Sequence, residues 1–135
     1  MSEVVRAKPR FGVMRLIDAT GYRLPLAGFV SILHRASGML MFLLLPFILY
    51  LLDKSLTSET TFAELQALTS GVFVKLVILA LSWAYLHHFC AGIRHLLMDL
   101  HYGLDKDSAR KSAVSVLAIS LVLAALIALK LFGVF

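Results

Sequence analysis

The chain contains three long runs of apolar residues, which are separated by short polar segments. The runs predict helices at about 27–52, 70–98 and 112–134, each near the roughly 20 residues that cross the hydrocarbon core of a bilayer. Connections this short make consecutive helices antiparallel neighbours. Pro46, inside the first run, removes one backbone hydrogen bond and predicts a bend. The pattern therefore predicts an all-α membrane protein with three transmembrane helices.

The composition agrees with this prediction. Of the 135 residues, 60% are hydrophobic and only 16% are charged, and the mean hydropathy is +0.89. A soluble domain of this length needs more polar surface. We expect a basic N-terminal arm at 1–25 and one membrane-anchor domain at 26–135. The net charge of +5 is more simply explained by membrane topology than by nucleic-acid binding, so we expect no nucleic-acid partner.

The distribution of basic residues predicts how the chain is oriented. Lysine and arginine collect in the arm and in the second connection, 99–111, whereas the first connection, 53–68, has one lysine beside acids. Cytoplasmic segments carry the excess of basic residues. We therefore expect a cytoplasmic N-terminus and a periplasmic C-terminus. The first apolar run contains Arg35 and lacks a small-residue cleavage pattern, so we expect it to be retained rather than removed as a signal peptide.

The most informative stretch is Tyr85–Asp99, at the end of the second predicted helix. His88, Gly92 and His95 fall on one stripe of that helix, because steps of three and four residues return to the same face. Ionisable groups inside a membrane are costly and indicate a functional site. A neutral imidazole is a good axial ligand for haem iron, and a glycine one turn away lets a flat macrocycle approach. Alternatively, the histidine bonds to a neighbouring helix and the glycine marks close packing.

The neighbours of His88 are expected to have other roles. His87 points about 100° away and cannot serve the same metal face. His95 lies about 10 Å along the axis from His88, so it can reach a haem propionate or lipid headgroups but not the same iron. Arg94 with His95 predicts either an anchor at the helix C-terminus or a propionate contact. Cys90 is the only cysteine, which excludes covalent haem attachment and an iron–sulphur cluster.

A second cluster lies in the first predicted helix. Ser31, Arg35 and Gly38 are spaced by four and three residues and share one face, with His34 beside them. Arg35 could extend to the headgroups. Alternatively, its guanidinium and the Ser31 hydroxyl stabilise negative charge on the carbonyl oxygens of a quinone. Arg35 and His88 both lie roughly 10 to 15 Å from the cytoplasmic ends of their helices, so one site can contain both.

These two stretches carry a resemblance to a known family. Ser31-Ile-Leu-His-Arg-Ala-Ser-Gly38 and His88-Phe-Cys-Ala-Gly-Ile-Arg-His-Leu-Leu-Met-Asp99 closely resemble the two signature segments of the cytochrome b subunit of bacterial succinate dehydrogenase. That subunit is the larger membrane anchor of respiratory complex II, in the inner membrane. The resemblance implies one subunit of a succinate:quinone oxidoreductase, without a complete active site of its own. Its implied partners are a flavoprotein, an iron–sulphur subunit and a second anchor subunit that completes the helix bundle.

The resemblance also implies roles for individual residues. His88 would supply one axial ligand to a b-type haem, and the second anchor subunit would supply the other. Ser31 and Arg35 would form part of the site where ubiquinone is reduced. Three side chains would lie near the haem propionates, namely His34, Arg35 and His95. His87 stands where the family often has an aromatic residue, and it is left without a role.

Two alternatives remain open at the level of sequence. One is an anchor subunit of a fumarate reductase, which runs the same chemistry in reverse. The other is a small proton-coupled transport or scaffold subunit whose histidines do not contact haem.

Overall fold

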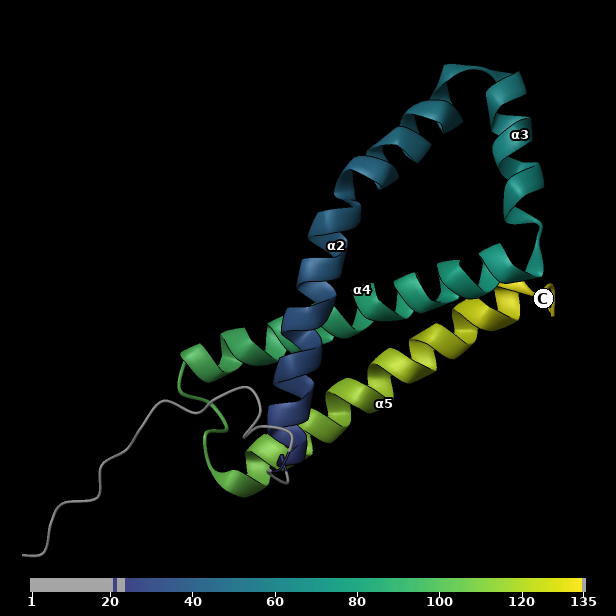
Figure 1. Cartoon of the computed structure of the whole chain (residues 1–135). Helices are drawn as coiled ribbons and strands as arrows, with labels where there is room; N and C mark the ends of the chain where they lie inside the picture. The colour runs from purple at the N-terminus through teal and green to yellow at the C-terminus, as the bar shows by residue number, and fades with distance from the viewer. Residues whose placement is uncertain (1–20, 22–23, 135) are drawn as a thin grey trace, which may run out of the picture.

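A computed structural model of the protein describes residues 21 and 24–134, and the predicted arm at 1–25 lies almost entirely outside them. In this part of the chain the order of helices is α2 (Leu26–Thr57), α3 (Glu59–Thr69), α4 (Val72–Asp99) and α5 (Lys106–Leu131) (Figure 1). By length and composition, α2, α4 and α5 are each long and apolar enough to cross a membrane. The prediction of an all-α protein with three transmembrane helices is confirmed.

The first predicted connection, 53–68, contains a helix of its own, α3. After α2 ends at Thr57, the Ser58 hydroxyl accepts a hydrogen bond from the backbone N–H of Thr61 at 3.2 Å. This hydrogen bond satisfies one of the free N–H groups at the start of α3. The negative charge of Glu59, in the first turn, interacts favourably with the positive end of the helix dipole. Polar residues here therefore continue helical structure instead of ending it.

The last helix begins earlier than its apolar run predicts. It starts at Lys106 rather than at residue 112, because the Asp105 carboxylate accepts a hydrogen bond from the backbone N–H of Ser108 at 2.9 Å. An aspartate in this position is among the best N-terminal caps. The first turns of α5 are consequently charged, and only the later turns are apolar enough for the bilayer interior.

The long helices meet at one end of the molecule. α4 and α5 run side by side, and the first half of α2 crosses them (Figure 1). A small core fills this crossing, formed by Val30, Ala91, Ala113 and Val116. Further along, α2 changes direction in its second half and leads away to α3 (Figure 1), and Pro46 lies inside this helix.

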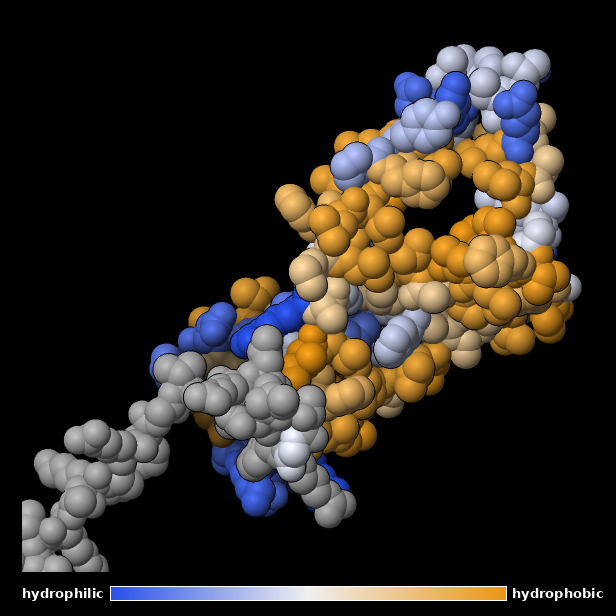
Figure 2. All heavy atoms as spheres, viewed as in Figure 1, coloured by the Kyte–Doolittle hydropathy of each residue, from blue (hydrophilic) through white to orange (hydrophobic). Residues whose placement is uncertain are grey.

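The surface has an apolar band between two polar ends. Figure 2 shows polar residues gathered at the α2–α3 connection and near the connection from α4 to α5, with apolar atoms covering the helices between them. Phe42 and Leu43 on α2 are among the large apolar side chains left exposed. Exposed apolar surface on this scale is suited to contact with lipid or with another membrane subunit.

Candidate functional site

Three histidines from two helices come together where α2 crosses α4. The rings of His34 and His88 are stacked, with centroids 4.1 Å apart and an interplanar angle of 21°. The ring of His95 is tilted against that of His34 by 39°, with the two centroids 5.0 Å apart. The helix crossing therefore brings His34 of the first predicted cluster against His88 and His95 of the second.

A backbone carbonyl determines which nitrogen of His88 is available. The Nδ1 atom of His88 lies 3.0 Å from the carbonyl oxygen of His34 and 3.2 Å from the Ser37 hydroxyl. A carbonyl only accepts, so in the neutral ring Nδ1 carries the proton and donates it. The lone pair then lies on Nε2, which is the arrangement found in most metal-ligating histidines.

Ser37 is a member of this site that the sequence reasoning did not assign. It is buried, with 8% of its surface exposed, and its hydroxyl donates to the His34 carbonyl at 2.9 Å while also contacting His88. The available signal was its spacing of three residues from His34, which places it one turn further along α2.

Two glycines border the histidines, and they differ in how closely the neighbouring ring approaches. A Cβ atom at Gly38 would lie 2.8 Å from Cε1 of His88, whereas a Cβ atom at Gly92 would lie 3.6 Å from Nε2 of His34, an ordinary contact. The ring of His88 therefore rests directly on the backbone of α2, and a side chain at Gly38 would displace it. The sequence analysis assigned Gly92 a different role, clearance for a macrocycle, which stays a prediction.

The residues predicted to bind a quinone lie on the same half of α2. Ser31 and Arg35 are one helical turn apart, with Ser31 partly buried and Arg35 exposed. Arg35 directly follows His34 in the chain, so its backbone adjoins the stacked histidines. Both polar groups are therefore accessible to a ligand approaching the first half of α2 from outside the helix crossing.

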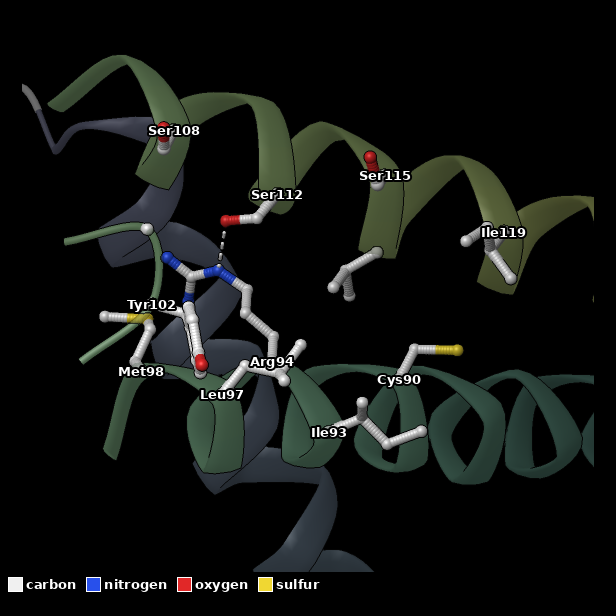
Figure 3. A pocket seen from close by; sticks show the side chains of 12 residues that line it. Cys90, Ile93, Arg94, Leu97, Met98, Tyr102, Ser108, Ser112, Ser115 and Ile119 are labelled. Carbon is white, nitrogen blue, oxygen red and sulfur yellow. Dashed lines mark hydrogen bonds between the residues drawn. The ribbon is translucent and has the colours of Figure 1, made fainter. Parts of the chain in front are cut away.

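Arg94 does not join this site. Its side chain is 5% exposed, its Nε donates to the Ser112 hydroxyl at 3.0 Å and its Nη2 donates to the Ala109 carbonyl at 3.4 Å. Both partners belong to α5, and Figure 3 shows the guanidinium reaching toward that helix. The contacts favour an interhelical role for Arg94 over the propionate contact considered with His95.

His87 also faces away from the stacked histidines. It is 1% exposed, it packs beside Trp83 with ring centroids 5.6 Å apart, and neither of its ring nitrogens has a hydrogen-bond partner among the described residues. Its ring contact is therefore with Trp83 and not with the stacked histidines. This arrangement agrees with the expectation that neighbouring histidines on a helix cannot serve one metal face.

The chemistry of the donor set is suited to a macrocyclic iron complex more than to a bare metal ion. Among residues 21 and 24–134, no three histidine, cysteine or carboxylate side chains form a group able to hold a metal ion. A haem needs only one or two axial ligands from protein, and His88 offers one. His95 adds a buried Nε2 with no hydrogen-bond partner in the described part of the chain. The residues present therefore fit one side of a haem site.

Comparisons with known proteins agree with this chemistry. A family model described as succinate dehydrogenase/fumarate reductase transmembrane subunit matches residues 17–127. The chain is similar to the succinate dehydrogenase cytochrome b556 subunit of Coxiella burnetii, with 36% identity over 107 residues, 78% of this chain and 86% of the relative. For the subunit of the same name from Paracoccus denitrificans, the identity is 35% over 105 residues, covering 78% and 81% of the two chains. The Rickettsia prowazekii subunit is 30% identical over 108 residues, covering 80% and 84%.

Proposed function

The chain belongs to the family of succinate dehydrogenase and fumarate reductase transmembrane subunits as a cytochrome b membrane anchor, and we propose that it contributes to both haem binding and quinone reduction. Specifically, it supplies one axial ligand to a b-type haem and part of the site at which ubiquinone is reduced. The relatives are subunits of an enzyme complex. Electrons from succinate would arrive through the flavoprotein and iron–sulphur subunits, and this chain alone would hold no complete active site.

The observation that carries the proposal is the hydrogen bond between His88 Nδ1 and the His34 carbonyl, at 3.0 Å. A hydrogen bond from the ring nitrogen that does not bind the metal sets the tautomer and the ring orientation of a ligating histidine and raises its basicity. Nε2 of His88 is then presented as the ligand. His34 and His95, whose rings lie close by, would contact the haem propionates, and Arg35 would add a positive charge. When bound, the haem would supply one-electron redox chemistry.

The stacking of His34 on His88 argues against an intrachain pair of ligands. Axial ligands bind iron from opposite faces of the macrocycle, but these two rings lie against each other with centroids 4.1 Å apart. Such rings cannot enclose a macrocycle between them. This supports a second ligand supplied by the proposed second anchor subunit, whose helices would complete the bundle.

Ser31 and Arg35 would hold the polar head of the quinone. As the quinone is reduced, negative charge develops on its carbonyl oxygens, and a guanidinium stabilises such charge most strongly where water is excluded. The Ser31 hydroxyl donates a hydrogen bond to one carbonyl oxygen. We place this site toward the cytoplasmic side, with the N-terminus cytoplasmic, because lysine and arginine collect in the N-terminal arm and in the second connection. Three spans would then put the C-terminus on the periplasmic side.

A matched pair of variants tests the haem ligand. In the purified complex, His88→Phe should abolish the bis-histidine band in the reduced-minus-oxidised absorption spectrum, because phenylalanine has no lone pair. His87→Phe should leave the band unchanged, because both ring nitrogens of His87 are without partners in the described residues. A normal band in His88→Phe would refute the assignment.

A second pair tests the quinone site. Arg35→Ala and Ser31→Ala should lower quinone reductase activity, by about tenfold or more for Arg35, while succinate oxidation by an artificial acceptor that takes electrons upstream is retained. Ser55→Ala removes a hydroxyl near the other end of α2 that donates only to the Leu52 carbonyl of its own helix, and it should affect neither activity. Equal loss of both activities in the Arg35 and Ser31 variants would contradict a role in quinone binding.

The family description covers fumarate reduction as well as succinate oxidation. The relatives reported above are all named as succinate dehydrogenase subunits, which favours succinate oxidation as the working direction. Rates measured in both directions on the purified complex distinguish the two, and a visible b-type spectrum distinguishes either from a scaffold or transport subunit without haem.

A further inference from the structure

A cavity of about 380 Å³ lies between α4 and α5, away from the stacked histidines. Its walls are largely apolar and include Ile93, Val116 and Ile119. Its polar end is formed by Arg94, with Tyr102 at the same end of the cavity (Figure 3). The cavity is therefore amphipathic, with one buried cation at one end and apolar walls along the rest.

The charge of Arg94 lacks a balancing anion in the described part of the chain. Its two hydrogen-bond acceptors, the Ser112 hydroxyl and the Ala109 carbonyl, are both neutral. Only 5% of the surface of Arg94 is exposed, so water does little to compensate its charge. A guanidinium has further N–H donors besides the two used here. Burying such a cation is costly unless an anion accompanies it.

The position of Arg94 along the helices matches the boundary between lipid headgroups and acyl chains. It precedes the end of α4 at Asp99 by five residues, and Ser112 follows the start of α5 at Lys106 by six. At the rise of an α-helix, both lie roughly 7 to 9 Å inside the helix ends. The cavity continues from there past Cys90 and Ile119, deeper along both helices.

We propose that this cavity binds an anionic phospholipid of the surrounding bilayer. The phosphodiester accepts hydrogen bonds from the free N–H groups of Arg94, and one acyl chain lies along Ile93 and Ile119. Arginine is suited to phosphate because its planar group can donate two parallel hydrogen bonds. The site is independent of the haem and quinone roles, because its lining residues face α5 and not the histidines.

The chain contains a convenient reporter of occupancy. Cys90 is the only cysteine in the sequence, it is partly buried, and it lines the cavity. An acyl chain in the cavity would shield its thiol from alkylation. The rate of N-ethylmaleimide labelling of Cys90, read by peptide mass spectrometry in the intact complex, therefore measures whether the cavity is filled.

The experiment uses the purified complex stripped of lipid by detergent exchange and then supplied with phosphatidylglycerol, phosphatidylcholine or inorganic phosphate. Phosphatidylglycerol should be retained in native mass spectra and should slow Cys90 labelling, whereas the other two additions should not. Arg94→Gln should weaken phosphatidylglycerol binding by roughly tenfold or more. Arg110→Gln, a matched change on the exposed surface of α5, should bind as the wild type does.

A second variant keeps the test decisive if Arg94→Gln fails to assemble. Ser115→Phe places a ring in the cavity from an exposed position of α5 and leaves both partners of Arg94 in place, so it too should lose phosphatidylglycerol. Unchanged retention in either variant, or equal protection by phosphatidylcholine, would overturn the proposal. Protection by phosphate alone would indicate a small-anion site instead. Slow labelling in the lipid-free complex would show that a protein segment fills the cavity.

Discussion

Replacing Gly38 with alanine should displace the ring of His88 while leaving α2 helical. The added Cβ atom would lie 2.8 Å from Cε1 of His88, and ordinary contact begins at 3.4 Å, so the ring must move by about 0.6 Å. Its Nδ1 is hydrogen-bonded to the His34 carbonyl at 3.0 Å. A displacement of this size away from α2 brings that distance near the limit of a hydrogen bond.

Two effects of known size then compete. Alanine is favoured over glycine inside a helix by about 1 kcal/mol, whereas loss of the His88 hydrogen bond costs about 1 kcal/mol, and the contact adds strain. Global stability should therefore change little. The orientation of the His88 ring should change considerably, and haem should bind less tightly. Losing the hydrogen bond that orients a ligating histidine lowers metal affinity by about 10- to 100-fold.

Gly92→Ala is the matched control. It has the same gain in helix propensity, but its Cβ atom meets only Nε2 of His34, at 3.6 Å. In the purified complex, haem per chain and the reduced-minus-oxidised band should fall in Gly38→Ala and remain near the wild-type value in Gly92→Ala, with thermal denaturation recorded for both.

A wild-type band in Gly38→Ala would refute the reasoning, because it would mean that the ring does not rest on α2 in the assembled complex. Loss of haem in Gly92→Ala with an intact fold would instead support Gly92 as the residue that lets the macrocycle approach, as the histidine stripe in the sequence predicted.

Three further predictions concern residues outside the histidine site. Ser112→Ala removes the acceptor of the Arg94 Nε–H and should lower the free energy of unfolding by about 1–3 kcal/mol, measured by thermal denaturation beside Ser115→Ala, whose exposed hydroxyl should matter little. His87→Phe should be as stable as the wild type or more so, because a buried ring without hydrogen-bond partners in the described residues loses only polar nitrogens. The hydrogen bond from a backbone N–H in the first turn of α5 holds the pKa of Asp105 below its usual range. The Asp105 carboxylate therefore stabilises the fold above about pH 4, and this contribution is lost as the pH falls through the lowered pKa. Asp105→Ala should remove that part of the acid dependence of the melting temperature.

Hydropathy and periodicity were sufficient for the membrane-spanning elements but not for their ends. An apolar run indicates which part of a helix is surrounded by lipid or protein. The residue at which a helix begins depends instead on local hydrogen bonds to the free N–H groups of its first turn. The caps at Ser58 and Asp105 therefore extend helical structure into segments whose polarity had suggested loops. The stripe containing His88 and His95 was visible because residues on one helix have a known spacing. Their contact with His34 was not, since it depends on where α2 crosses α4.

The faces of α4 separate two sites that the sequence places in one stretch. His88 and His95 face His34 on α2, whereas Cys90 and Arg94, four residues apart, line the cavity against α5. Successive residues of a helix are turned by about 100°, so neighbours in sequence can serve different partners. A change at Gly38 of α2 acts on one face of α4 through His88, and a change at Ser112 of α5 acts on the other through Arg94. The two changes share no partner side chain, so their effects on stability should add. A complex carrying both Gly38→Ala and Ser112→Ala should therefore lose haem as Gly38→Ala does and lose stability as Ser112→Ala does. A marked departure from additivity would show that α4 shifts as a unit and couples the cavity to the haem ligand.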